Sequence, residues 1–394
     1  MKTIIAGALG LLSVVGLTAV QQSWDERSRA QSIEAEKRGL AEPFKGLTAA
    51  GTIEPGLFGI RSSGVTMAPV QKAAGAFLQS LTAEQRAKTT FAVEDDEWRK
   101  WMNQHFYRRQ GVSFQEMSEA QRESAFGLLR AALSAKGLKL TRDVMKLNHT
   151  LGELNNNNFE QYGEWLYHLT VMGQPSASEP WGWQLDGHHM IINYFVLGDQ
   201  VVMTPFFTGS EPVTATAGKF KGTTILQDEQ AAGLAMITAL DDAQRKKAIL
   251  EVSKTGNNNL TEAWKDNVVL NYAGVPANEL SPAQREKLLG LVKMFVDNME
   301  EGHARVRMEE VRKHLNRTHF AWIGGTDPSA VFYYRIHSPV ILVEFDHQRP
   351  ANLRHLAADP SKPTREHIHV VVRTPNGNDY GKDLLRQHYA QHKH

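Results

Sequence analysis

Histidines and carboxylates in the second half of the chain have spacings that suit a metal site. Eight of the 16 histidines lie at or after His337. His367 and His369 are separated by one residue, and alternate side chains of a β-strand share a face. Both imidazoles would therefore point the same way and could bind one ion, while Ile368 would enter the core on the opposite face of the strand.

Two carboxylates in a neighbouring predicted strand follow the same alternation. Glu344 and Asp346 share a face, and Phe345 lies opposite. One of the two would be a third or fourth metal ligand or the general base. Arg335, on the preceding predicted strand, would stabilise negative charge that develops on a substrate oxygen.

A further histidine pair follows Asp186-Gly187 in an earlier predicted strand. Consecutive strand residues point to opposite faces, so at most one of His188 and His189 would join the site as a metal ligand. His189 would share its face with Asn193, and His188 would share its face with Asp186. The pattern leaves both histidines open.

Composition narrows the chemistry further. The chain has no cysteine, so disulfides and iron–sulfur clusters are excluded and any metal must be held by nitrogen and oxygen ligands. A formal net charge of +1 gives no general attraction for nucleic acid or an anionic membrane. We therefore expect a divalent cofactor (zinc, iron or manganese) and a small polar substrate or ligand, with no motif that indicates the oligomeric state.

The N-terminal residues have the pattern of a targeting segment. Lys2 precedes an apolar run over residues 4–20, which predicts a secretory signal peptide over residues 1–20, with an uncleaved membrane anchor as the alternative. Residues 21–66 are polar at first and then rich in small residues, which predicts a flexible tether. An extracytoplasmic location, periplasmic or secreted, follows from this interpretation.

A six-residue pattern occurs four times and predicts helix starts. Each copy has an apolar residue, then Thr, Ser or Asp, then Gln-Arg at its end: Leu81–Arg86, Met117–Arg122, Leu240–Arg245 and Leu280–Arg285. The Thr, Ser or Asp side chain can cap the helix, and the side chain of the Gln three residues later can accept a hydrogen bond from the backbone amide of the capping residue. We therefore prefer capping to a repeated binding box. Helices are expected over 82–88, 118–136, 241–254 and 281–300, and another over 159–170.

Strand patterns fall into two separated groups. The first comprises Trp183–Val196 and Val201–Phe207 around a Gly198-Asp199 turn; the second comprises His319–Ile323, Val331–His337, Val340–Phe345 and His367–Arg373. A helix over Leu384–Gln391 closes the chain. Helices precede strands twice, without regular alternation. The pattern predicts an α+β fold: one domain over 68–392, with a mainly antiparallel sheet from two β segments flanked by two helical segments.

Other catalytic motifs are missing from the sequence. It contains no phosphate-binding loop, no Gly-x-Ser-x-Gly elbow and no His-Glu-x-x-His helix. Trp181 and Trp183 fit core or rim packing better than a platform for stacking a ring. The polar run Asn257–Asn259 predicts a loop.

Several runs taken together resemble a known family, the uncharacterised domain of unknown function 3500. They are Pro180–His189, Thr204–Gly209, Tyr333–Ile336, Leu342–Asp346, His367–His369 and Asn378–Leu385 with His388. The resemblance implies an exported protein and no particular reaction. It places motif residues at His188, His189, Tyr334, Arg335, Glu344, Asp346, His367, His369 and Asp379. The chain departs from it at His337 and His347, where amides are expected, and in a longer link over 348–366.

Two function classes follow from these observations. The leading hypothesis is an exported metal-dependent enzyme, more hydrolytic than redox in character, whose nucleophile is a metal-bound water. A redox version would hold iron or copper in the same ligands. The second class is a non-enzymatic extracytoplasmic protein that binds a metal or a small ligand, and a third is a surface protein whose histidines are incidental.

Overall fold

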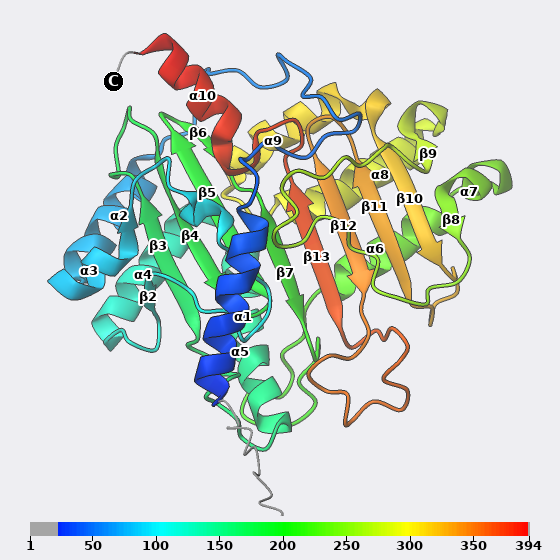
Figure 1. Cartoon of the computed structure of the whole chain (residues 1–394). Coiled ribbons are helices and arrows are strands. Elements are labelled where there is room, and N and C mark those ends of the chain that lie inside the picture. The colour runs from blue at the N-terminus through cyan, green and yellow to red at the C-terminus, as the bar shows by residue number, and fades with distance from the viewer. Residues whose placement is uncertain (1–22, 393–394) are drawn as a thin grey trace, which may run out of the picture.

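The computed structural model describes residues 23–392, and within them the chain forms one 13-stranded sheet with ten α-helices (Figure 1). The sheet order is β1-β3-β4-β5-β7-β13-β12-β11-β10-β8, with β2, β6 and β9 paired beside it. Only the β1–β3 and β8–β10 pairs are parallel. The predicted mixed fold with a mainly antiparallel sheet is confirmed. The predicted signal peptide lies outside the described residues.

The first half of the chain builds one side of the sheet. Its helices are α1 (Trp24–Gly39), α2 (Ala68–Ser80), α3 (Ala83–Thr89), α4 (Glu119–Ala132) and α5 (Ala135–Leu154). Its strands are β1 (Thr90–Phe91), β2 (Val112–Ser113), β3 (Tyr167–Met172), β4 (Trp181–Gly187), β5 (Met190–Leu197), β6 (Gln200–Val202) and β7 (Phe206–Ser210).

The second half builds the other side. Its helices are α6 (Gln227–Thr238), α7 (Asp242–Ala248), α8 (Pro282–Val296), α9 (Glu301–Lys313) and α10 (Lys382–Gln391). Its strands are β8 (Ile249–Glu251), β9 (Val275–Pro276), β10 (His319–Gly324), β11 (Phe332–His337), β12 (Leu342–His347) and β13 (Ile368–Arg373).

The two halves repeat one order of elements. The series α2-α3-β1-β2-α4-α5-β3-β4-β5-β7 is followed by α6-α7-β8-β9-α8-α9-β10-β11-β12-β13, and the halves meet where β7 pairs antiparallel with β13. The four predicted capping boxes are confirmed at the starts of α3, α4, α7 and α8. The boxes also contact one another in pairs, because Gln121 donates to Gln85 and Gln284 donates to Gln244, each at 2.7 Å.

The sheet has two unlike faces. Helices α2, α4, α5, α6, α8 and α9 pack on one face and enclose the main apolar core, to which Ile368 and Phe345 contribute from β13 and β12. The other face, turned toward the viewer in Figure 1, is covered by α1, α10 and long loops. This loop-covered face receives the polar side chains of β11, β12 and β13. Trp181 and Trp183 are fully buried in the core, as packing residues would be.

Some local predictions need correction. Residues 159–170 form turns and the start of β3 instead of a helix, and the helix expected over 241–254 ends at Ala248. The predicted helix over 118–136 divides at Leu133 and Ser134, where Ser134 caps a second helix. The predicted strand Val201–Phe207 divides into β6 and β7, and β7 pairs with β5 and β13.

Residues 23–66 differ from a flexible tether. The polar helix α1 begins with a capping box at Ser23 and Glu26 and lies on the chain: Tyr107 donates to Glu36 at 2.9 Å. After α1, Leu47 is fully buried and residue 48 forms a bridge with residue 269. The segment holds its shape through these long-range contacts, which its composition does not reveal. No described helix is long and apolar enough to cross a membrane.

Candidate metal centre

Three imidazoles converge at the junction of the two halves. The Nε2 atom of His369 lies 3.1 Å from Nε2 of His189 and 3.0 Å from Nε2 of His367. Nitrogens held about 2.0–2.1 Å from one ion lie about 2.9–3.4 Å apart in octahedral or tetrahedral coordination. The ligand atoms of the three histidines, all buried, lie within 4.8 Å of one another and could hold a metal ion.

The opposite nitrogens of two rings fix the direction of the lone pairs. Nδ1 of His367 lies 2.7 Å from the carbonyl oxygen of Arg349, and Nδ1 of His369 lies 2.7 Å from Oε1 of Glu262. Both partners are acceptors, so each neutral ring donates from Nδ1 and keeps a lone pair on Nε2. The two lone pairs then face each other at 3.0 Å. A cation placed between them would turn this repulsion into coordination.

Strand geometry places His369, and a glycine makes room for it. His369 of β13 pairs in register with Gly209 of β7, while Ile368 is fully buried on the helical side of the sheet. A Cβ atom on Gly209 would clash with the carbonyl oxygen of Ile368 and would lie 3.2–3.3 Å from the rings of His369 and His189. The absence of a side chain at this position therefore lets two imidazoles approach each other across β7.

A tight turn, and not a strand, presents His189. The run Trp183–Val196 divides into β4 and β5, so the prediction that His188 and His189 point to opposite faces is wrong. The backbone of His189 has a positive φ of 64°. Residues other than glycine rarely adopt such a φ, and those that do are enriched at functional sites. The hydroxyl of Tyr167 donates to the carbonyl oxygen of His188 at 2.8 Å and helps to hold the turn.

His188 lies beside the three converging histidines and has its own partner. Its ring stacks on that of His189 at 4.0 Å between centroids, and its Nδ1 lies 2.8 Å from Oδ1 of Asn148 on α5. The rings of His105 and Tyr162 lie 5.4 Å and 5.9 Å from it. His188 therefore links the candidate metal centre to a second group of aromatic and polar side chains.

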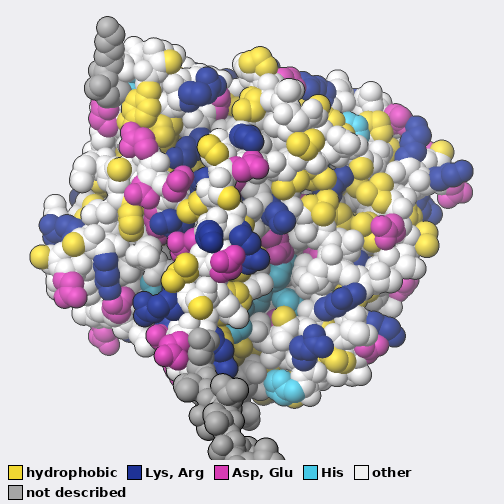
Figure 2. Space-filling view, in the orientation of Figure 1, with side chains coloured by type: hydrophobic (Ala, Val, Ile, Leu, Met, Phe, Trp, Pro, Cys, Tyr) yellow, Lys and Arg dark blue, Asp and Glu magenta, His cyan; other side chains and the backbone are white. Residues whose placement is uncertain are grey.

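Burial keeps two of the candidate ligands, His189 and His369, neutral. Desolvation, followed by the neighbouring histidines, holds the pKa values of His189 and His369 well below their usual range. Neutral imidazole is the form that binds metals, so these rings need not lose a proton near pH 7. His189, His367 and His369 are 5%, 3% and 7% exposed, and Figure 2 shows histidine side chains in a hollow of the loop-covered face.

Glu344 and Asp346 bind a loop, and the structure records no hydrogen bond from either to the three histidines. Glu344 accepts from the amides of Leu260 and Thr261 at 2.9 Å and from the hydroxyl of Tyr333 at 2.7 Å. Asp346 pairs with Lys254 at 2.8 Å and accepts from the Asn258 amide. Both carboxylates therefore anchor residues 254–262, the loop that presents Glu262 to His369.

Arg335 and two histidines also lie apart from the centre. In the registers of the sheet, His369 faces Asp346, Asp346 faces Tyr333, and Arg335 follows two residues later on β11. His337 lies beyond Arg335 on the same strand. His347 is a core residue on the helical side, where it accepts from the amide of residue 332 at 2.8 Å and contacts Gln230 at 2.7 Å.

Two residues of the candidate centre were not predicted from sequence. Glu262 lies in a loop without periodicity, so no local pattern connects it to His369; the polar run Asn257–Asn259 beside it was the only signal. Glu211 accepts from the amides of residues 351–353 and lies 3.8 Å from Nδ1 of His367. It thereby ties the long link over 348–366 to the candidate centre.

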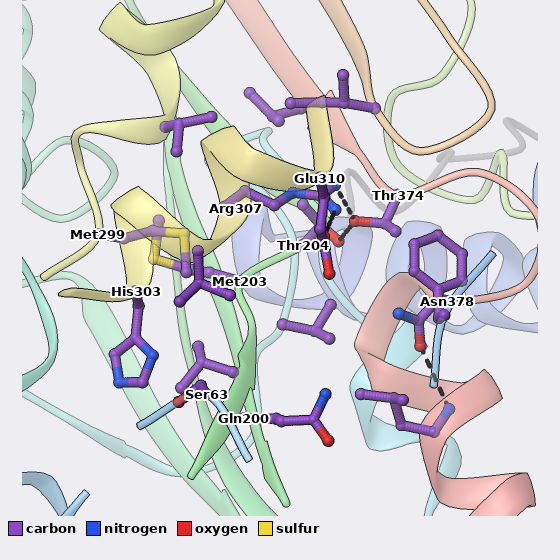
Figure 3. Close-up of a pocket in the computed structure, with 18 of the residues that line it drawn as sticks. Ser63, Gln200, Met203, Thr204, Met299, His303, Arg307, Glu310, Thr374 and Asn378 are labelled. Atoms are coloured by element: carbon purple, nitrogen blue, oxygen red, sulfur yellow. Dashed lines mark hydrogen bonds and ion pairs between the residues drawn. The ribbon is translucent and has the colours of Figure 1, made fainter. Parts of the chain in front are cut away.

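A separate pocket, shown in Figure 3, has polar groups that satisfy one another. It encloses about 60 Å³ beside α9, room for a few water molecules. Arg307 donates to Thr374 at 2.9 Å and to the carbonyl oxygen of Val340 at 2.7 Å, and it pairs with Glu310 at 2.8 Å. The main cation of this pocket is therefore already neutralised.

The model of the family described as protein of unknown function (DUF3500) matches residues 63–382. The chain therefore belongs to this family, and the resemblance carried by its motifs is confirmed. Neither the curated proteins nor the solved structures gave a match. The geometry of the candidate centre is thus the basis for the functional argument.

Proposed function

We propose that the chain is an exported metal-dependent enzyme, hydrolytic in type, in which His189, His367 and His369 bind one divalent ion. The observation that supports this most is the convergence of three buried Nε2 atoms. Three histidines and an open position form a common arrangement of catalytic zinc, so zinc is the first candidate, followed by iron and manganese. Such an ion would supply a bound water of lowered pKa as the nucleophile.

The surroundings favour a small polar substrate. Glu262 would orient His369 and strengthen its donation to the ion, as carboxylate partners of metal-bound histidines do. Beyond His188, the hydroxyl of Tyr162 lies 3.4 Å from His105 and 3.3 Å from Asn352, so the polar groups continue outward from the centre. These groups could hydrogen-bond a ligand that approaches the ion from that side.

Metal analysis of the full chain tests the proposal. We expect one equivalent of divalent metal after reconstitution with zinc, iron or manganese, and its loss in His367→Ala and His369→Ala. His355→Ala, which changes an exposed histidine on the long link, is the matched control and should retain the metal. A wild-type chain that binds none of the three metals would refute the metal site and leave metal-free acid–base chemistry, small-ligand binding or incidental histidines.

A second candidate is a metal-binding protein without catalysis. The small exposure of the three histidines favours it, because a closed site leaves little room for substrate. Cobalt substitution separates the two: an open position should let azide change the visible absorption of the bound cobalt, whereas a closed site should not respond. Export is tested by N-terminal sequencing of the protein from its native host, where intact Met1 on a membrane-bound product would indicate an anchor.

A further inference from the structure

A second group of buried polar side chains lies on the loop-covered face, apart from the three converging histidines. Arg335 and His337 are alternate residues of β11, so they point the same way, and they are 4% and 1% exposed. Nε of Arg335 and both ring nitrogens of His337 are buried without a hydrogen-bond partner. The one recorded hydrogen bond of Arg335 is a long 3.4 Å contact with the carbonyl oxygen of Asn271.

Other buried arginines of the same face are fully paired. Arg373 donates to Asp379 and Asp266 at 2.7 and 2.8 Å, and Arg109 donates to Asp186 at 3.0 Å. Among the described residues, no carboxylate forms an ion pair with Arg335. An unpaired buried cation destabilises a fold strongly, and so does an unsatisfied imidazole. Arg335 and His337 therefore stand out, because among the described residues neither has an ion pair and their only recorded hydrogen bond is the 3.4 Å contact of Arg335.

The repeat within the chain makes the contrast sharper. Asp186 is paired with Ile191 at the end of β4, as His337 is paired with Leu342 at the end of β11. In the first half, the loop between β1 and β2 supplies Arg109 as the partner of Asp186. In the second half, the corresponding loop between β8 and β9 supplies no acid to Arg335 or His337. Asp186 therefore has an ion-pair partner from its loop, whereas Arg335 has only Glu344 opposite it on β12, with no ion pair recorded between them.

Tyr272 forms part of the cover over these residues. The half-buried ring of Tyr272 lies 4.6 Å from the ring of His337 and stacks on His319 at 4.9 Å. Glu344, which lies opposite Arg335 on β12, already accepts hydrogen bonds from four protein donors and is held by the loop over 254–262. The ring of Tyr272 therefore covers His337 on one side.

We propose that Arg335 and His337 bind a small oxyanion, a carboxylate or a phosphate group, beneath Tyr272. The guanidinium Nε–H and an imidazole N–H would donate to two oxygens of the ion, and hydrogen bonds of this kind between charged groups are short and strong. Entry requires the Tyr272 ring to swing aside. The site is separate from the candidate metal centre, because Asp346 and the anchored loop lie between them.

Calorimetric titration of the full chain with inorganic phosphate, and separately with acetate, tests the site. We expect one ion per chain for at least one of the two, and the arm that binds identifies the oxyanion. Arg335→Gln and His337→Phe should each weaken binding by about tenfold or more. Arg130→Gln, which removes an exposed arginine already paired with Glu123 on α4, is the matched control and should change affinity less than about twofold.

The variants also separate this site from the metal centre and from general charge attraction. Unchanged affinity in His369→Ala is expected; lost binding there would place the ion on the metal centre and overturn the proposal. An equal loss in Arg130→Gln would indicate general charge attraction and would refute the site, and so would a wild-type chain that binds neither ion. His337→Phe removes two unsatisfied nitrogens, so it should fold at least as stably as wild type and decides the matter if Arg335→Gln misfolds.

Discussion

Replacing Glu262 with glutamine should weaken zinc binding by about 10- to 100-fold, the usual effect of losing a partner behind a metal-bound histidine. Oε1 of Glu262 lies 2.7 Å from Nδ1 of His369, which is one of three candidate ligands. A neutral amide oxygen would accept a hydrogen bond about half as strong as the carboxylate does. The expected loss corresponds to about 1.4–2.7 kcal/mol of binding free energy.

Competition with a chelator of known zinc affinity at pH 7.5 measures this loss. Glu97→Gln is the matched control, because it makes the same chemical change in a buried carboxylate whose recorded ion pair is with Lys100, outside the loop over 254–262. We expect little change in its zinc affinity. The opposite pattern, with zinc binding lost in Glu97→Gln and kept in Glu262→Gln, would refute the role assigned to Glu262.

Four further predictions concern packing, caps and pH. Ile368→Ala should cost about 2–5 kcal/mol in urea unfolding and spare metal binding, because the side chain is fully buried on the helical side. Gly209→Ala should weaken metal binding in the same chelator assay, since its Cβ crowds two ligand rings. Ser118→Ala and Ser281→Ala should each cost about 0.5–2 kcal/mol in thermal unfolding and leave metal binding unchanged. Burial lowers the pKa of His347 to about 3, so its contribution to stability is complete above about pH 6.5 and falls by up to about 1.4 kcal/mol per pH unit below it; the pH slope of unfolding should be smaller in His347→Gln.

Each of these has a contrary result. Metal loss in a folded Ile368→Ala protein would mean that the core and the candidate centre are coupled. Tight metal binding by Gly209→Ala would mean that β7 can move away from the rings. Altered metal binding in either serine variant would make its box functional, and an unchanged pH slope in His347→Gln would assign the acid sensitivity to other buried histidines.

Local sequence patterns were sufficient to predict the helix caps and the proximity of His367 and His369 in the candidate metal centre. The four boxes start helices because a cap needs only a side chain and amides within three residues of it. Ile368 and His369 alternate in β13 as strand geometry requires, and His367 lies one residue before the strand with its ring beside that of His369. The four boxes also occur as two pairs, one in each half of the chain, which is consistent with an internal repeat. The repeat could be recognised only from the order of helices and strands in the structure.

Tertiary structure decided the remainder. The run through His188 and His189 fits one long strand, and the antiparallel pairing of β4 with β5, together with the hydrogen bond from Tyr167, divides it. The alternation of Glu344 and Asp346 predicted the face on which they lie. It did not predict their partners, because the hydrogen bonds of both carboxylates go to the loop over 254–262 and not to a histidine. Glu262 comes from that loop and contacts His369 across 107 positions of sequence. Residue spacing reports which side chains share a face, whereas the partner of a buried charge depends on which distant segment folds over it.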